Sequence, residues 1–394
     1  MKKINMAFNL YSKLIVLFLL LGCSEQSEKS NIDYSKEFNS ILNTFNESSI
    51  LEFDESSYLD EIFISEFLRK LDPQKTIFIQ DDINDIKSLK RDKNDYGIFK
   101  QSVERFYLRF NESISYRAKL LESYNFDFEK NEHIFLEPRK TYFLNRNEKN
   151  EYDRKYLKNE IISSMLEEKS YKDAIKELSQ SYSERKSSLR KIRDSDKFGI
   201  LANNFLSLLD PHSSYFSKRD LENWNLRMNL SFEGIGAVLS YENEKAKIEE
   251  LMPGGPAINS KKINVGDKII RVGEGKRGRL VNVIGWRLDD IVERIRGEEG
   301  TIVKLEIEND DGKNVIELER GRVSLEESDA SEEILEFNGR KLGYIKVPSF
   351  YSDTECFKIN SYACKSATND VRKFLRDFRF EGIEGVIIDL RNNG

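Results

Sequence analysis

Two closely spaced glycines near the middle of the chain are the residues whose type and spacing best predict a chemical role. They lie in Gly234-Ile235-Gly236-Ala237, directly before the strand-like residues 238–241. Glycine has no Cβ, so backbone N–H groups at such a turn can converge on one anion. We therefore expect these four residues to form a pocket for a carboxylate, and in particular for the free carboxyl end of another polypeptide.

Histidine and cysteine are too scarce to build a metal centre. The 394 residues include only His133 and His212, with Cys23, Cys356 and Cys364. Zinc and iron sites are built from clusters of such ligands, so we predict no metal and no cofactor. The same shortage removes the usual general base of a nucleophilic hydrolase and leaves lysine or carboxylate for that role.

One short stretch contains the residue types of a catalytic triad, namely Asp210, His212, Ser213 and Ser214. Triads are assembled from separated segments whose side chains converge, and neighbours on one turn do not normally point at each other in the required order. We therefore expect a structural role for His212.

The charge balance argues against nucleic acid as a partner. The chain carries 63 basic and 69 acidic residues, mixed along the sequence, with a formal net charge of -6. No basic patch is evident. With 39% hydrophobic residues over 394 positions, the chain can form two or three domains with cores of their own.

Residues 1–22 predict an export signal. Two lysines precede an apolar run at 14–21 that is too short to span a bilayer, and Leu20-Leu21-Gly22-Cys23 resembles the bacterial lipobox. Cys23 would then carry the lipid, and residues 23–32 would form a polar linker. We expect a lipoprotein anchored to a membrane and facing the periplasm, with Ser24 favouring the outer membrane. A plain secreted protein and an uncleaved anchor are the alternatives.

Three regions follow along the chain. Residues 33–226 have few glycines and apolar residues at helical spacing, which predicts an all-α domain. It contains a repeated motif at 67–73 and 205–211, in which Leu-Asp-Pro ends an apolar helical turn. Residues 227–322 have short strand-like runs with glycine turns and one amphipathic helix at 287–296. Residues 323–394 predict a strand, a helix and an apolar strand, which is the start of an α/β layer.

The second region resembles a PDZ domain. The resemblance rests on the glycine segment 234–237, on Met252-Pro253-Gly254-Gly255-Pro256-Ala257 and on the run 265–272. The resemblance implies that Gly234, Ile235, Gly236 and Ala237 hold the carboxylate of a bound tail. It also implies a groove lined by the apolar helix residues Leu288, Ile291, Val292 and Ile295. These four side chains can alternatively face the core of the domain itself, and a β-domain without a ligand is the simpler alternative.

The whole chain from Asp33 onward resembles the tail-specific, or C-terminal processing, serine proteases. The motifs that carry the resemblance include Leu209-Asp210-Pro211-His212, the segment 233–239, the segments 284–292 and 341–351, and Asp389-Leu390-Arg391-Asn392-Asn393-Gly394. The resemblance implies a multidomain α+β fold with an N-terminal all-α domain, a PDZ-like β-domain with a groove helix, and the beginning of an α/β protease domain. It implies a periplasmic serine endopeptidase that recognises protein tails. The apolar residues of the groove helix favour tails that end in apolar residues.

In that family a serine nucleophile and a lysine base follow the last of these motifs. No serine of the chain matches the nucleophile's motif, so the resemblance assigns neither residue here. We expect the chain to be a fragment and the 394 residues alone to be proteolytically inactive. Gly394 is the one candidate for a contribution to the oxyanion hole of the family.

Cys356 and Cys364 remain as a pair once Cys23 carries a lipid. An even number of cysteines in an exported protein favours a disulfide that closes a small surface loop, with two free thiols as the alternative. For the function as a whole, the alternative to a protease is a non-catalytic lipoprotein adaptor whose PDZ domain binds protein C-termini for a separate enzyme.

Overall fold

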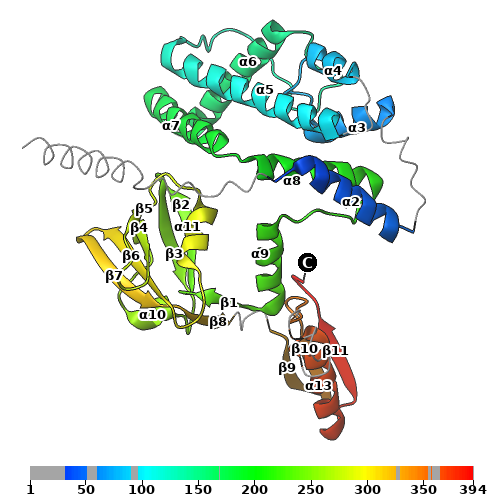
Figure 1. Ribbon diagram of the computed structural model, residues 1–394, viewed down its shortest axis with the longest axis vertical. Helices are drawn as coiled ribbons and strands as arrows, with labels where there is room; N and C mark the ends of the chain where they lie inside the picture. Colours follow the sequence, from blue (N-terminus) through cyan, green and yellow to red (C-terminus); the bar gives the residue numbers. More distant parts are fainter. Residues whose placement is uncertain are drawn as a thin grey trace, which may run out of the picture. The chain divides into compact units, whose positions relative to one another are not determined.

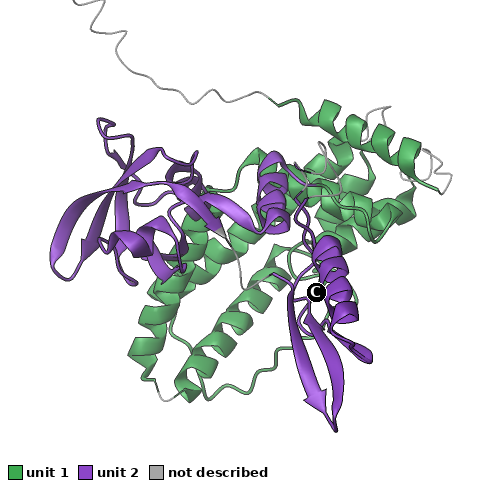
Figure 2. Cartoon of the chain, turned by 90° about the horizontal axis from the view of Figure 1, so that it is seen from below, with its two compact units in different colours: residues 1–215 green, residues 216–394 purple. Residues whose placement is uncertain are grey.

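The computed structural model describes residues 32–50, 60–89, 96–167, 169–324, 329–353, 356 and 364–393. The chain divides into two compact units between Tyr215 and Phe216 (Figure 2). The predicted export signal 1–22, Cys23 and Gly394 lie outside the described residues, as does nearly all of the linker. Of the helices described, none has the length and apolar character needed to cross a bilayer.

The first unit is built from helices (Figure 1). They are α2 (Tyr34–Ser48), α3 (Glu61–Leu71), α4 (Gln80–Lys87), α5 (Tyr96–Ser123), α6 (Arg146–Leu166), α7 (Tyr171–Arg190) and α8 (Asp194–Leu209). Their apolar faces form two cores. One core joins α2, α3, α5 and α8 around the rings of Phe38, Phe99 and Phe205. The other joins α5, α6 and α7 around Leu157 and Tyr182.

The two copies of the repeated motif each end a helix. The C-cap of α3 is Asp72 and that of α8 is Asp210, and a proline follows both. Proline disfavours helical backbone at the preceding residue, so both helices end there. The Asp72 carboxylate then accepts hydrogen bonds from the amides of Thr76, Ile77 and Phe78 at 2.9, 2.9 and 3.0 Å. The predicted helix-stop-helix unit is confirmed.

Charged side chains are enclosed between the helices of the first unit. Asp82 of α4 has no exposed surface and accepts hydrogen bonds from Nε and Nη2 of Arg109, both at 2.8 Å. Arg117 of α5 donates to Asp153 of α6 at 2.6 Å, and Lys149 donates to the same carboxylate at 3.2 Å. Each of these buried charges has a partner of opposite sign, as burial requires.

The second unit begins with α9 (Lys218–Asn229) and continues into an antiparallel sheet. The strands and short helices are β1 (Ser231–Gly234), β2 (Ala237–Glu242), β3 (Lys245–Leu251), α10 (Pro256–Ser260), β4 (Lys268–Glu274), β5 (Val281–Asn282), α11 (Leu288–Ile295), β6 (Ile302–Asn309), β7 (Gly312–Glu319) and β8 (Gly321–Ser324). The sheet order is β2-β3-β4-β6-β7 with β5 on β4, and β1 pairs separately with β8. Alternate residues of the strands, such as Ile248, Ile269 and Leu305, are fully buried in its core.

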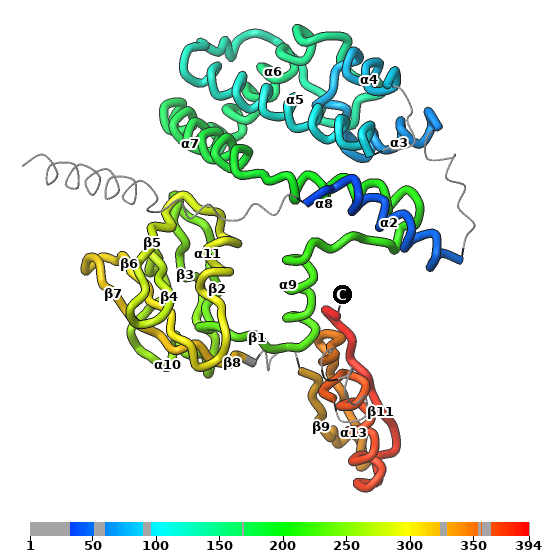
Figure 3. The backbone as a smooth tube through the Cα atoms, in the orientation of Figure 1, coloured from blue at the N-terminus to red at the C-terminus, as the bar shows by residue number. Residues whose placement is uncertain are grey.

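The chain then forms a small α/β layer from β9 (Ser331–Phe337), β10 (Arg340–Lys346), α13 (Ala367–Phe380) and β11 (Gly385–Asp389) (Figure 3). The order is β11-β10-β9, and β10 and β11 are parallel because α13 lies in the connection between them. Gly343 of β10 lets α13 approach closely, since a Cβ there would lie 2.3 Å from the ring of Phe378. The predicted fold class, all-α followed by a β-region with one amphipathic helix and an α/β region, is confirmed.

The division between the units falls before α9, whereas the predicted helical domain extends to residue 226. The contacts of α9 explain the difference. Arg219 donates to Asp289, Asp290 and Glu293 of α11, and Leu230, just after α9, packs into the core of the α/β layer. A helical sequence pattern shows that α9 forms but not which unit it joins.

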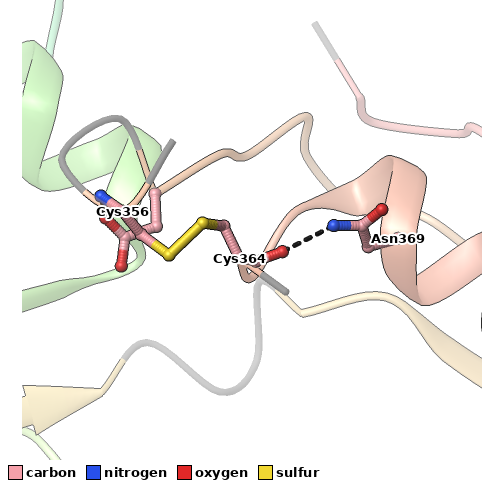
Figure 4. The surroundings of a disulfide bond; sticks show 4 residues. Cys356, Cys364 and Asn369 are labelled. Carbon is pink, nitrogen blue, oxygen red and sulfur yellow. Dashed lines mark hydrogen bonds between the residues drawn. A yellow bond between two sulfur atoms is a disulfide. The ribbon is translucent and has the colours of Figure 1, made fainter. Parts of the chain in front are cut away.

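Cys356 and Cys364 are joined by a disulfide (Figure 4). Cys364 is buried, and its carbonyl oxygen accepts a hydrogen bond from Nδ2 of Asn369 at 2.7 Å. The bond therefore links the segment after β10 to the start of α13.

Candidate functional site

The glycine segment 234–237 joins β1 to β2. Gly236 has a φ of +73°, in the left-handed region that glycine occupies without strain. Two successive carbonyl groups face the same neighbouring segment: Ile235 O accepts from the Ala257 amide at 2.8 Å, and Gly236 O accepts from the Met252 amide at 2.9 Å. Among the described residues, the amides of Ile235 and Gly236 have no acceptor. They can therefore bind an anion.

Close backbone packing supports this turn from the carbonyl side. A Cβ on Gly236 would lie 3.0 Å from the Cα of Gly255 and 3.2 Å from a methyl group of Val323. The Pro-Gly-Gly-Pro segment at 253–256 thus passes directly behind the glycine loop. The two motifs that suggested a PDZ domain are one structural unit.

The strand that follows the loop lies at the edge of its sheet. β2 pairs only with β3 among the described strands, and α11 contacts it (Figure 1). Ala237 and Leu239 of β2 pack against the core, whereas Val238 between them is exposed. The free edge of β2 beside a helix is the geometry in which an extended peptide can add a strand.

The helix α11 runs antiparallel to β2. Before its first turn, the Gly285 amide donates to Glu244 O, beyond the end of β2, at 2.7 Å. After its last turn, Cγ of Arg296 lies 3.7 Å from the place of a Cβ on Gly234. The end of α11 is held by Arg320, whose Nε donates to Ile295 O at 2.8 Å. The acceptor-free amides therefore lie at the C-terminal end of α11.

The four helix residues predicted to line the groove do not behave alike. Leu288 and Val292 are partly exposed, but Ile291 and Ile295 are buried in the core of the domain, with 0% and 4% exposure. The prediction is corrected for Ile291, because a side chain without exposed surface does not line a groove. Ile295 belongs to the same core cluster. Leu288 and Val292 thus keep exposed surface on α11, and Gly234, Ile235, Gly236 and Ala237 lie where β1 ends and β2 begins. Their role in binding a tail stays a prediction.

Two arginines at this site were missed by sequence reasoning. Arg219 holds the outer face of α11 through the three acidic residues named above. Arg296 donates from Nη1 to Asn223 Oδ1 of α9 at 3.0 Å and lies with its guanidinium carbon 5.8 Å from the centre of the Phe232 ring. Burial lowers the pKa of Arg296, while the charge of Glu222 opposes that shift. The only sequence signal for Arg296 is its place directly after the apolar helix face.

A second polar cluster lies at the end of β11. Arg391 donates from Nε and Nη2 to the Asp389 carboxylate, at 2.9 Å to Oδ1 and 2.6 Å to Oδ2, and Tyr344 donates to Oδ2. These hydrogen bonds, from Arg391 first and Tyr344 next, lower the pKa of Asp389. Asn393 Nδ2 donates to Val347 O at 3.0 Å, so the turn after β11 is fixed to the end of β10.

The remaining candidates do not form a reactive centre. Ser213 donates to Asp210 at 2.6 Å within one turn, and His212 is exposed. No three His, Cys, Asp or Glu side chains of the described residues gather where they could hold a metal ion.

Three family models match successive parts of the chain. The "Tail specific protease N-terminal domain" matches residues 52–219, the "PDZ domain" matches residues 223–308, and "Peptidase family S41" matches residues 341–394. A tail-specific protease of Haemophilus influenzae is 31% identical over 354 residues, which cover 86% of this chain and 48% of that protein. The three matches and this relative together support a C-terminal processing protease family for the chain.

Two further proteins are similar to parts of the chain. The carboxy-terminal processing protease CtpB of Bacillus subtilis is 29% identical over 198 residues, covering 50% of this chain and 36% of that protein. The crystal structure of the PDZ domain of a Vibrio cholerae carboxy-terminal protease in complex with peptide is 43% identical, with a TM-score of 0.23, and covers 24% of this chain and 100% of that one. The chain spans 48% of the length of the Haemophilus influenzae protein and 36% of the length of the Bacillus subtilis protein.

Proposed function

We propose that this protein is a serine-type endopeptidase that recognises the C-terminal tails of its protein substrates through the PDZ domain. The observation that carries the proposal is the pair of acceptor-free amides, Ile235 and Gly236, at the start of an unpaired strand edge. A tail that adds antiparallel to β2 would bring its carboxylate to these amides, and its backbone would satisfy the free edge of the strand.

The proposed tails end in apolar residues. Ala237 and Leu239 face the core side of β2, and Leu288 and Val292 keep exposed surface on the helix beside it. An apolar side chain placed between them would be removed from water, whereas a charged one would lose its hydration without gaining a partner.

The proposed cleavage uses the serine nucleophile and lysine base that the family resemblance implies. Neither role is assigned to a residue of 1–394, so the groups described here act by selecting and holding the tail. The fixed turn at Asp389 and Arg391 supports this part of the proposal, because an oxyanion hole that follows it needs a rigid backbone.

The proposed location is the periplasm, with a lipid anchor on Cys23. A leader followed by Leu-Leu-Gly-Cys supports the anchor, and the disulfide between Cys356 and Cys364 agrees with an oxidising compartment. Metabolic labelling with a radioactive fatty acid tests it: the unsubstituted protein should be labelled and the Cys23→Ser variant should not. A labelled variant would contradict the anchor.

Peptide titration tests the recognition step. Ten-residue peptides ending in Ala or Val, with a free or an amidated carboxyl end, are titrated onto the purified chain. The free acids should bind more tightly than the amides by a factor of about ten or more, because each carboxylate hydrogen bond lost costs roughly 1.5–3 kcal/mol. Equal binding of acid and amide contradicts tail recognition.

A second assay tests cleavage. The gene product that contains these residues is incubated with a substrate protein bearing an apolar tail, and the products are identified by mass spectrometry. Cleavage that a serine-reactive phosphonate inhibits supports the protease. Tail binding without cleavage by that gene product supports the adaptor instead.

A further inference from the structure

We infer that Arg296 is a second anchor for the bound tail, and that its guanidinium group binds the terminal carboxylate together with the loop amides. The inference rests on the proposed tail recognition and adds a charged residue to it. It predicts that the domain distinguishes a free carboxylate by charge as well as by backbone hydrogen bonds.

The position of Arg296 is the first argument. Because α11 runs antiparallel to β2, a tail that is antiparallel to β2 runs parallel to α11. Its carboxyl end therefore lies where α11 ends, and Arg296 is the residue after the last turn. Its stem lies alongside Gly234, at 3.7 Å from the place of a Cβ on that glycine, so the side chain borders the carboxylate loop itself.

The state of its charge is the second argument. In the described part of the chain, no carboxylate lies within 4.0 Å of the guanidinium group, and its one side-chain hydrogen bond is that from Nη1 to Asn223. Glu222 is the nearest acidic influence from α9, and Phe232 offers only its ring. A partly buried cation without a counter-ion gains from an incoming anion, which restores the pairing that burial requires.

Other arginines of the second unit have acidic partners. Arg320 donates to both oxygens of Glu274 at 2.7 Å, and Arg219 contacts three acidic side chains. Arg271 lies 3.1 Å from Glu306. Arg296, by contrast, borders the glycine loop 234–237, and its side-chain hydrogen-bond partner is the uncharged Asn223.

The test combines a change in the peptide, from a free to an amidated carboxyl end, with a change in the protein at Arg296. Free-acid and amidated forms of one Val-ending peptide are titrated onto the unsubstituted chain and onto Arg296→Gln, Arg296→Lys and the control Arg271→Gln, which removes the same charge from β4. In Arg296→Gln the preference for the acid over the amide should fall about tenfold, as expected for one charge-assisted hydrogen bond, while amide binding stays within about twofold. Arg296→Lys keeps the charge and should retain part of the preference, and Arg271→Gln should retain all of it.

Two results overturn the inference. If Arg296→Gln and Arg296→Lys weaken acid and amide equally, Arg296 supports the fold of the loop rather than the ligand. If both variants keep the full preference, Arg296 does not touch the carboxylate. A failure of the proposed tail recognition looks different, because the unsubstituted chain would then show no preference at all.

Discussion

A buried charged site in the first unit and the surroundings of the glycine loop in the second unit differ in how their charged groups are paired. In the first unit, Asp82 is fully buried and its carboxylate accepts hydrogen bonds from Arg109 and Arg105. In the second unit, Arg296 has only an amide side chain for a partner, and the loop amides beside it have no acceptor among the described residues. A network whose members are paired stabilises its own fold, whereas incomplete pairing next to a strand edge leaves groups that a ligand can pair with.

The comparison predicts which substitutions lower the stability of the fold and which weaken the binding of a tail. Residues of the first unit should matter to stability and little to tail binding, and those around the glycine loop should show the reverse order. The following substitutions test that division, beginning with the largest expected effect.

Replacement of Asp82 by Ala should destabilise the first unit by about 3 kcal/mol, because the buried Arg109 would lose the acceptor of its Nε and Nη2 groups and keep only Glu112, which accepts from Nη1 at 2.8 Å. The measurement is the free energy of unfolding in urea. Asp85→Ala is the matched control: Asp85 is exposed and lies 3.5 Å from Arg105, so its loss should cost less than about 1 kcal/mol. Equal losses of unfolding free energy in the two variants would contradict the role of the paired buried charges in stabilising the first unit.

Replacement of Cys356 and Cys364 together by Ser should destabilise the α/β layer by about 2–3 kcal/mol, as expected for a loop with a sequence separation of 8 residues. The thermal unfolding midpoint should fall, and a reducing agent should lower the midpoint of the unsubstituted chain but not that of the double variant. Tail affinity should not change, since the disulfide lies outside the β2 sheet. An unchanged midpoint after reduction would contradict a stabilising disulfide.

Replacement of Gly236 by Ala should abolish detectable tail binding and cost about 2 kcal/mol of stability. A Cβ there is both strained by the positive φ and only 3.0 Å from Gly255. Gly275→Ala is the control, because Gly275 has a φ of +66° and no atom within 4 Å of the added Cβ. That variant should lose about 1 kcal/mol and bind tails normally. The difference between the two variants therefore measures the effect of the contact with Gly255, apart from the cost of a positive φ.

Sequence patterns predicted most of the elements, because helix and strand periodicity are local properties. They failed where the answer depends on how elements meet. The spacing of Leu288, Ile291, Val292 and Ile295 defines one helix face, but the sheet beneath decides that Ile291 is enclosed while Val292 keeps exposed surface. Arg296 could not be singled out, because the absence of an acidic partner is a property of the folded neighbourhood and not of its sequence neighbours.

The smallest expected effect is the loss of stability of the first unit in acid, through the protonation of Glu132. Hydrogen bonds from Arg154, which outweigh the effect of burial, and from Lys130 and Lys158 lower the pKa of Glu132 from 4.5 to about 2. A carboxyl group whose pKa is lower in the folded state stabilises fully above 4.5, and this contribution is lost as the pH falls from 4.5 towards 2.

Glu132→Gln keeps the volume and one acceptor, so it should cost about 1 kcal/mol at pH 7. The difference from the unsubstituted chain should shrink between pH 4.5 and pH 2, where the native carboxylate takes up its proton. Urea unfolding at pH 7, 4 and 3 measures it, with Glu129→Gln, an exposed neighbour, as the control. A gap that stays constant with pH would mean that Glu132 contributes through packing and not through charge, and the first unit would then be less dependent on its paired charges than the comparison requires.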